Sequence, residues 1–277
     1  MPFSVPDSVT AVTDRLRACG HAAYLVGGCV RDLLRGITPH DYDVATDATP
    51  QETIAAFPDR RVIETGIKHG TVTVLSGGDP IEVTTFRVDG AYGDHRRPDA
   101  VTFTPSLRED LARRDFTVNA MAWGEEGLVD PFGGQKDIER RIIACVGEPE
   151  RRFTEDALRV MRALRFAATL GFAIEPATAA AIRKMAPTLA AVSFERKWAE
   201  LTKWLCGGNA LPVLEAYRDV VDLLLPEFIG RPADWAILPL LPPEKEPRLA
   251  AFLAPLTGQE AAAVLARFKC DGATRKR

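Results

Sequence analysis

Apolar and polar positions alternate in short runs over the first half of the chain. The apolar residues 24–26 precede two glycines and a segment with helical spacing, which predicts a strand, a tight turn and a helix. Further strands with alternating apolar residues are predicted at residues 61–65, 70–75 and 80–86. Helices are predicted at residues 8–19, from Thr49-Pro50 onward, and at residues 107–122. This part should form a small mixed sheet with helices that ends near Trp123.

From about residue 134 onward, the spacing of apolar residues is helical almost throughout. Only the apolar pair Ile142-Ile143 suggests a strand. Helices are predicted at residues 154–169, 177–186, 194–206, 210–225 and 248–268. The proline-rich residues 238–247 are predicted to form a loop. The pattern therefore predicts an α+β fold, in which a small mixed β-sheet region precedes an all-α region.

The composition is that of an ordinary soluble globular protein. With 277 residues, of which 46% are hydrophobic and 26% charged, the chain can form one large domain or two to three small ones. No run approaches the ~18 apolar residues of a membrane span, and no signal peptide is recognisable. We therefore expect a cytoplasmic protein with no membrane association, and no obligate protein partner is evident. The five cysteines are scattered, so neither a disulfide framework nor a zinc site is indicated.

The charges are distributed unevenly along the chain. A net charge of −3 does not by itself indicate a nucleic-acid-binding protein. The arginines, however, occur in pairs and in a three-residue ladder, namely Arg96-Arg97, Arg113-Arg114, Arg140-Arg141, Arg151-Arg152, and Arg159, Arg162 and Arg165. Local basic patches fit an enzyme that holds a nucleotide and a polyanionic substrate. The alternative is that several of these arginines pair with neighbouring acidic residues on solvated helix faces.

The strongest candidate site follows the first predicted strand. Gly27 and Gly28 would let the backbone approach a polyphosphate, while the helix start and Arg31 would supply N–H groups and positive charge. Asp41 and Asp43 are two residues apart on a second predicted strand and would therefore share one face. Like charges so close repel unless a cation lies between them, and hard oxygen ligands suit Mg²⁺. Taken singly, the glycines could form an ordinary turn and the aspartates could be solvated.

Two further residues of the first half are candidates for the same site. Glu82 lies on the last predicted strand and could approach the two aspartates as a third carboxylate, or could be an exposed or paired glutamate. Arg114, in the helix predicted at residues 107–122, could reach a triphosphate. Its neighbour Arg113 could instead form an exposed ion pair with Asp110. The glycine-rich, charged residues 88–99 are predicted to form a mobile loop.

The helix predicted at residues 154–169 also carries candidate residues. Asp156 and Arg159 are three residues apart and would meet on one helix face. A carboxylate beside a guanidinium offers an acceptor and donors that match the edge of a base. Arg162 and Arg165 would continue this ladder of arginines. The alternative is that Thr154 caps the helix and that the acidic residues lie in its first turn, where the helix dipole favours them.

The glycine pair followed by Asp41 and Asp43 resembles the signature of the polymerase-β-like nucleotidyltransferase superfamily, which transfers nucleoside monophosphates with two metal ions. Over residues 24–172 the chain resembles the class II tRNA nucleotidyltransferases, a family that includes bacterial poly(A) polymerases, and is most like a bacterial CCA-adding enzyme. The resemblance rests on the ordered motifs GGCVRD, DYD, ETGIKHGTVTV, IEVTTFR, DHRRPDAVTF, RRDFTVNA, DPFGGQKDI and EDALRVMRALRF.

The resemblance implies specific roles for these residues. Asp41 and Asp43 would be catalytic and would hold Mg²⁺. Nucleotide-binding roles would fall to Gly27, Gly28, Arg31, Arg114, Asp156, Arg159, Arg162 and Arg165, with Asp156 and Arg159 selecting the incoming base. The substrates would be CTP, ATP and tRNA, which the enzyme would contact at its 3′ end and acceptor stem.

The family also implies a division of the chain into domains. Residues 1–134 would form a catalytic nucleotidyltransferase head, residues 135–190 a helical neck that binds the base, and residues 191–277 a helical body with a shortened tail that binds RNA. The implied activity is the addition of CMP and AMP to the tRNA 3′ end. An enzyme that adds only A, a poly(A) polymerase and a non-catalytic RNA-binding relative remain open as alternatives, and the oligomeric state is not predicted.

Overall fold

The computed structural model describes residues 3–90, 101–232 and 234–269, which form two compact units. Of these residues, the sheet unit comprises 3–90, 101–140 and 144–147, and the helical unit comprises 141–143, 148–232 and 234–269. The predicted boundary at residue 190 between neck and body stays a prediction. Most of the loop predicted at residues 88–99, Cys270 and the basic C-terminal residues 275–277 lie outside the described residues.

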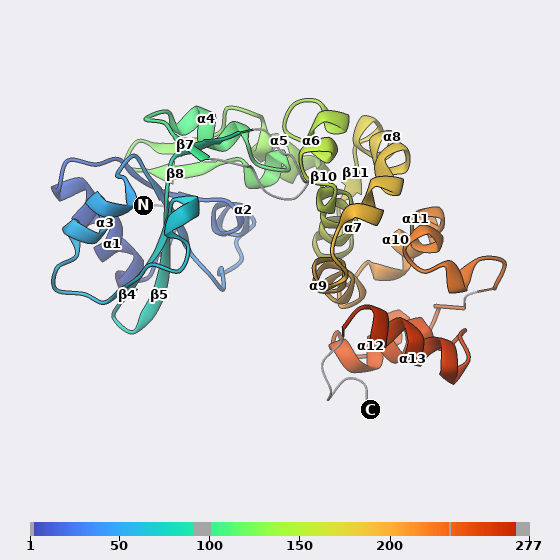
Figure 1. The fold of residues 1–277 in the computed structure, drawn as a ribbon. Helices are drawn as coiled ribbons and strands as arrows, with labels where there is room; N and C mark the ends of the chain where they lie inside the picture. Colours follow the sequence, from blue (N-terminus) through green and yellow to red (C-terminus); the bar gives the residue numbers. More distant parts are fainter. Residues whose placement is uncertain (1–2, 91–100, 233, 270–277) are drawn as a thin grey trace. The chain divides into compact units, whose positions relative to one another are not determined.

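The sheet unit is built on a seven-stranded sheet with the strand order β3-β4-β5-β2-β1-β8-β9. Figure 1 labels β4, β5 and β8 of this sheet. Its strands are β1 (Ala23–Val26), β2 (Asp43–Thr46), β3 (Val62–Ile63), β4 (Thr71–Ser76), β5 (Asp79–Thr85), β8 (Ala122–Gly124) and β9 (Gly127–Val129). The β2–β5 pair is parallel and all the other pairs are antiparallel. The predicted mixed sheet is therefore confirmed, although it continues beyond Trp123 into β9.

Helices cover one face of this sheet. They are α1 (Asp7–Ala18), α2 (Gly28–Leu34) and α3 (Pro50–Ala56). Their apolar side chains form a core with Leu25, Val44 and other inward-facing residues. The helix predicted from Thr49-Pro50 is confirmed as α3, and the structure adds a capping box between the Thr49 and Glu52 side chains at its start. Because side chains alternate along a strand, Asp43 and Ala45 project from the opposite face to Val44.

The secondary structure differs from the prediction at residues 107–122 and at Val88. The helix predicted at residues 107–122 ends early, as α4 (Leu107–Ala112), and is followed by the 3₁₀ turn η2 (Thr117–Asn119) and by β8. The backbone of Phe116 is extended and forms a β-bridge with Cys145, so this distant pairing overrides the local helical pattern. Val88 belongs to β6 (Arg87–Asp89), which pairs with β7 (Val101–Phe103), and not to a loop.

The helical unit contains the helices predicted for the second half, with three of them broken, whereas the loop predicted at residues 238–247 begins with a 3₁₀ turn and ends inside α12. Its helices are α6 (Pro149–Glu155), α7 (Leu158–Leu170), α8 (Pro176–Met185), α9 (Phe194–Leu205), α10 (Ala210–Ala216), α11 (Arg218–Leu224), α12 (Lys245–Leu253) and α13 (Gly258–Arg267). The predicted strand near Ile142 is confirmed as β10 (Ile142–Ile143), which pairs with β11 (Ala173–Ile174). The α5 helix (Gly134–Arg140) belongs to the sheet unit. Within the described ranges no helix is long and apolar enough to cross a membrane.

Candidate active site

Asp43 is the first residue of β2 and has a charged environment. Burial of its carboxyl group raises the pKa of Asp43, and the negative charges of Glu82 and Asp41 raise it further, while the Arg114 guanidinium lowers it. Asp41 is exposed and precedes the strand, so the prediction that both aspartates lie within one strand is wrong. The β1–β2 ladder reaches only the Val26–Asp43 pair, because β1 ends before Gly27. The two carboxylates are nevertheless close enough to repel each other.

Glu82 lies directly beside Asp43 in the parallel β2–β5 pair. Side chains at paired positions project from the same face of a sheet, so Glu82 shares the face of Asp43. Its side chain is exposed. Across the described part of the chain, no three His, Cys, Asp or Glu side chains are grouped closely enough to hold a metal ion. Glu82 thus lies on the expected face but does not form a three-carboxylate group with Asp41 and Asp43 in the described structure. Its role as a third metal ligand stays a prediction, and Asp41 and Asp43 remain the candidate ligands.

Tyr42 separates the two aspartates and anchors the segment in the core. Its ring packs into the helix-covered core near Cys29, and burial raises the pKa of both groups, that of Cys29 to about 11. The hydroxyl group of Tyr42 is buried and has no hydrogen-bond partner within the part of the chain that the structure describes. A buried polar atom without a partner costs free energy, whereas the aromatic ring contributes favourable packing.

Replacing Tyr42 with phenylalanine should therefore leave the protein as stable as before or stabilise it by up to about 1–3 kcal/mol, because the unpaired hydroxyl is removed. Tyr42→Ala should instead destabilise it by about 3–5 kcal/mol through loss of the ring. Urea unfolding of the three proteins measures both effects. A Tyr42→Phe protein that is clearly less stable than the parent would show that the hydroxyl group makes a stabilising contact.

Gly27 occupies a backbone conformation that requires glycine. Its φ of 76° and ψ of −131° are unfavourable for other residues, and a Cβ atom would lie 2.9 Å from Nη1 of Arg114. Gly28 begins α2, where a Cβ atom would lie 3.6 Å from Nη2 of Arg31. The structure thus brings the predicted residues Gly27 and Arg114 together, and Gly28 and Arg31 together, although Arg114 is 87 positions after Gly27 in the sequence.

Arg31 is fixed by a hydrogen-bond network that sequence reasoning missed. Its Nε and Nη2 atoms donate to the two carboxylate oxygens of Asp32 at 2.9 and 2.8 Å, and Nη1 donates to Oδ1 of Asn119 at 2.7 Å. The Asn119 amide in turn donates to Asp115 at 3.4 Å. Asn119 is buried, and its motif RRDFTVNA offered the one signal that could have identified it. The network orients the Arg31 guanidinium group.

Arg114 and Arg113 both bind Asp110, which is completely buried. The predicted alternative of an exposed Arg113–Asp110 pair is therefore wrong. Arg113 donates from Nε at 2.9 Å, whereas Nη2 of Arg114 lies farther away at 3.3 Å. The Nε atom of Arg114 is buried without a hydrogen-bond partner among the described residues. Arg114 therefore has unused donor capacity next to Gly27 and a favourable charge interaction with Asp43.

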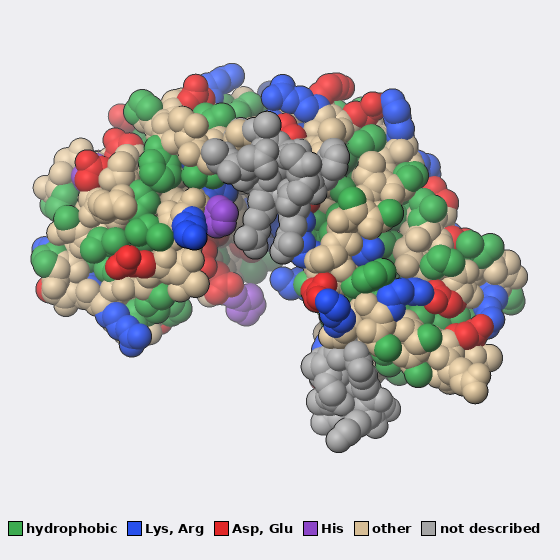
Figure 2. Space-filling model, in the orientation of Figure 1, with side chains coloured by type: hydrophobic (Ala, Val, Ile, Leu, Met, Phe, Trp, Pro, Cys, Tyr) green, Lys and Arg blue, Asp and Glu red, His purple; other side chains and the backbone are tan. Residues whose placement is uncertain are grey.

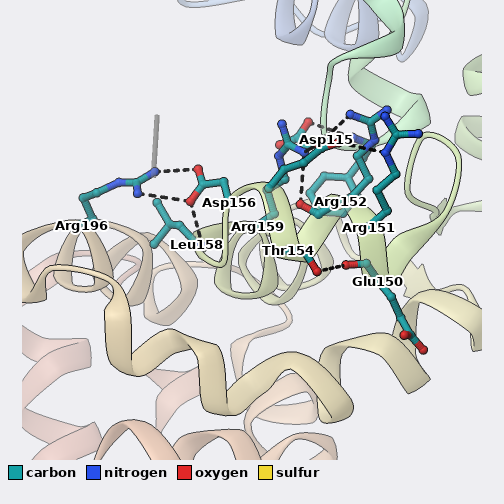
Figure 3. Close-up of polar contacts among 11 residues, drawn as sticks. Asp115, Glu150, Arg151, Arg152, Thr154, Asp156, Leu158, Arg159 and Arg196 are labelled. Carbon is teal, nitrogen blue, oxygen red and sulfur yellow. Dashed lines mark hydrogen bonds and ion pairs between the residues drawn. The ribbon is translucent and has the colours of Figure 1, made fainter. Parts of the chain in front are cut away.

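Asp156, in the helical unit, lies between α6 and α7 and not within a helix. Its φ of −142° and ψ of 105° are extended, so the continuous helix predicted at residues 154–169 is wrong. Thr154 does not cap a helix start, because it lies inside α6 and donates to the carbonyl oxygen of Glu150. Arg196 of α9 holds the Asp156 carboxylate through hydrogen bonds of 3.2 and 2.7 Å (Figure 3). This partner is 40 residues away in the sequence.

The three arginines of the predicted ladder all lie on α7, where Arg159 pairs with Glu155 and the other two lie near Glu200. Arg159 is buried and donates to Glu155 at 2.6 Å and to the carbonyl oxygen of Arg152 at 3.2 Å. Because Asp156 lies outside α7, the prediction that Asp156 and Arg159 share one helix face is wrong. Arg165 donates to Glu200 of α9 at 2.5 Å and lies 3.8 Å from the centre of the Phe166 ring.

Arg162 has a longer contact with the same glutamate. Its Nη1 atom lies 3.9 Å from Oε1 of Glu200, which is buried. Sequence reasoning missed both α9 residues, Arg196 and Glu200. Their spacing of four residues on a predicted helix places them on one face, which was the available signal.

Several basic residues pair with neighbouring acidic residues, as the alternative reading of the sequence anticipated. Arg151 and Arg152 lie 3.4 and 2.9 Å from Glu155, and Lys184 lies 2.7 Å from Glu150. Figure 2 shows basic and acidic side chains interspersed on the visible face of each unit. Charge alone therefore does not identify an RNA-binding surface on this face.

Comparisons with known proteins agree with these features. The family model described as "Poly A polymerase head domain" matches residues 23–144, and the model described as "Probable RNA and SrmB- binding site of polymerase A" matches residues 171–228. The CCA-adding enzyme of Geobacillus kaustophilus is 51% identical over 212 residues, which are 75% of this chain and 52% of that protein. The enzyme of Geobacillus stearothermophilus is 49% identical over 244 residues, which are 87% of this chain and 56% of that protein.

Solved structures give the same relationship. The crystal structure of the Bacillus stearothermophilus CCA-adding enzyme in complex with CTP matches with a TM-score of 0.70 and 40% identity, and covers 94% of this chain and 68% of that one. The chain spans only about half the length of the two curated relatives. From the glycine turn, the paired aspartates and these matches, we conclude that the chain belongs to the family of class II tRNA nucleotidyltransferases and bacterial poly(A) polymerases.

Proposed function

We propose that the chain carries out CCA addition, in which CMP and AMP are transferred from CTP and ATP to the 3′ end of tRNA. The observation that carries this proposal is the charge arrangement beside Gly27, where Asp43 interacts with Asp41, Glu82 and Arg114. The names and substrates of the relatives support the choice of reaction. In the reaction, the 3′-hydroxyl oxygen of the RNA bonds to the α-phosphorus, the bond to pyrophosphate breaks, and the hydroxyl proton passes to solvent.

The family uses a divalent metal, and we propose that it is Mg²⁺ held by Asp41 and Asp43. The repulsion among Asp41, Asp43 and Glu82 fits a cation at this place, and two protein carboxylates suit Mg²⁺, which fills its remaining positions with water and substrate phosphates. When bound, the metal would activate the attacking oxygen and neutralise the leaving pyrophosphate.

The basic residues would bind the triphosphate. The missing side chain of Gly27 allows a phosphate to approach the backbone, and the neighbouring Arg114 has donor capacity to spare. Arg31 presents a guanidinium group that Asp32 and Asn119 hold in place. A planar guanidinium binds two phosphate oxygens at once, so both arginines suit this role better than lysine would.

In the helical unit, we propose that Asp156 and Arg159 select the base, and that Arg162 and Arg165 also contact the nucleotide. Cytosine and adenine both carry an exocyclic amino group that can donate to the Asp156 carboxylate. Uracil and guanine present a carbonyl oxygen at the corresponding position, which a carboxylate repels. No nucleic-acid template is then needed for the choice of base.

The test is the incubation of a tRNA transcript that lacks its 3′ CCA with CTP and ATP, separately and together. Three added nucleotides that require both CTP and ATP would support CCA addition. One added A, or many, would indicate an A-adding enzyme or a poly(A) polymerase of the same family. No addition, with retained tRNA binding, would indicate a non-catalytic RNA-binding relative.

Asp156→Ala is expected to lower the preference for CTP over UTP by about one to two orders of magnitude, because a lost bidentate base contact costs ~1–3 kcal/mol. The Asp156 carboxylate also accepts from the backbone N–H of Leu158 at 3.1 Å. Loss of this cap should lower the stability by ~0.5–2 kcal/mol at the same time. Measuring kcat/KM for all four nucleotides and the melting temperature separates the two effects. A lower melting temperature with an unchanged CTP:UTP ratio would contradict base selection by Asp156.

A further inference from the structure

We propose that Arg196 is a specificity-determining residue, which positions the Asp156 carboxylate so that it accepts a base with an exocyclic amino group. The inference rests on the proposed function, because it concerns the choice between nucleotides. It extends base selection from Asp156 and Arg159 to a residue of α9, whose own contact with the nucleotide is not required.

The geometry of the pair is that of a rigid two-point contact. Nη1 of Arg196 donates to Oδ1 of Asp156 at 3.2 Å, and Nη2 donates to Oδ2 at 2.7 Å (Figure 3). Two parallel hydrogen bonds between planar groups fix the plane of the carboxylate as well as its position. The backbone N–H of Leu158 adds a third donor, to Oδ1 at 3.1 Å. Asp156 lies in the break between α6 and α7, so its backbone alone would hold it less firmly than a helix would.

The number of hydrogen bonds that the Asp156 carboxylate can still accept then limits which ligand groups it can bind. An ionised carboxylate has about four lone-pair sites, and Arg196 and Leu158 use three of them. One site is left for a further donor, which matches the single amino group on the edge of cytosine or adenine. The Asp156 side chain is 15% exposed, so this site is not closed off from solvent. A carbonyl oxygen of uracil or guanine would instead face the Asp156 carboxylate, which is also an acceptor and which Arg196 keeps from rotating.

The position of Arg196 is itself fixed by the packing of α9 against α7. One helical turn after Arg196, the buried Glu200 binds Arg165 of α7 at 2.5 Å. The two α9 residues carry opposite charges and pair with opposite charges on the segment from Asp156 to Arg165. A charge contact alone would not require two parallel hydrogen bonds, whereas fixing the plane of the Asp156 carboxylate does.

The test compares Arg196→Gln and Arg196→Lys with the parent protein. Both variants lose the two-point contact, and Arg196→Lys keeps the positive charge. For each protein, kcat/KM for CTP and UTP is measured on the same RNA, and the binding of both nucleotides is measured by calorimetry. We expect the CTP:UTP ratio to fall about tenfold or more in both variants. The double variant Asp156→Ala/Arg196→Gln should have the same ratio as Asp156→Ala alone, because Arg196 acts through Asp156.

Arg183→Gln is the matched control in the same unit. Arg183 lies 3.5 Å from Asp219 in a more exposed pair, and its replacement should leave the CTP:UTP ratio unchanged. An unchanged ratio in Arg196→Gln, whether or not the melting temperature falls, would overturn the inference, as would full selectivity in Arg196→Lys. A parent protein that adds no nucleotide would instead refute the proposed function. In that case the calorimetric preference for CTP over UTP, compared between the parent and the Arg196 variants, would still test the role of Arg196.

Discussion

Replacing Asp43 with asparagine is expected to lower nucleotide addition by about 10³-fold or more while the protein stays folded. The carboxylate is a proposed metal ligand, and an amide group cannot replace its charge. Without metal, however, this carboxylate is half-buried next to Asp41 and Glu82, which makes its charged form unfavourable. The variant should therefore be at least as stable as the parent at neutral pH when a chelator is present.

The same residue should give the stability a particular pH dependence. The pKa of Asp43 is raised above its ordinary value of 3.8, so the folded protein binds this proton more tightly than the unfolded chain does. The contribution of Asp43 to stability is therefore most favourable at low pH and declines as the pH rises through the raised pKa. Melting temperatures measured with a chelator should show the gain of Asp43→Asn over the parent increasing with pH.

Two other aspartates serve as controls for this experiment. Asp41→Asn should also abolish addition, but Asp41 is exposed, so its replacement should change stability little. Asp47 accepts a hydrogen bond from the backbone N–H of Ala22 at 2.8 Å and has no role in the proposed site. Asp47→Asn should therefore retain activity. Near-parental rates of Asp43→Asn at saturating Mg²⁺ would refute the assignment of the metal ligands.

The second large effect is expected for Arg114→Lys, which should lower kcat/KM for CTP and ATP by about 10²–10³-fold. Lysine keeps the charge but loses the planar fork that binds two phosphate oxygens. Because Arg114 also lies beside Gly27 and offsets the repulsion around Asp43, its guanidinium group is placed where a triphosphate would approach the proposed metal site. Steady-state kinetics with each nucleotide measures the loss.

Arg113 provides the matched comparison, because it is the adjacent residue and shares the partner Asp110. Its hydrogen bond to this buried carboxylate is the shorter one, at 2.9 Å against 3.3 Å. Arg113→Lys should therefore cost stability, about 1–3 kcal/mol, with little change in kcat/KM. If both variants lost activity equally, the arginines would act together in supporting Asp110, and a separate phosphate contact by Arg114 would be refuted.

The sequence by itself determined the elements whose causes are local. Periodicity predicts the α+β order and the strands around residues 71–85. The start of α3 follows from Thr49-Pro50, and the turn before α2 follows from Gly27, whose positive φ favours glycine. The candidate residues Asp41, Asp43 and Gly27 could be identified from sequence for the same reason, since they lie within one short stretch of strand, turn and helix.

Only the tertiary structure decided which side chains hold one another. Arg114 lies beside Gly27 because the segment after α4 leaves the helical path to pair with Cys145, and Asp156 lies outside a helix where Arg196 binds it from 40 residues away. Local spacing at both places favoured a continuous helix. Hydrogen bonds to distant partners outweigh the fraction of a kcal/mol per residue that helix propensity supplies, and no pattern within the segment records where those partners lie.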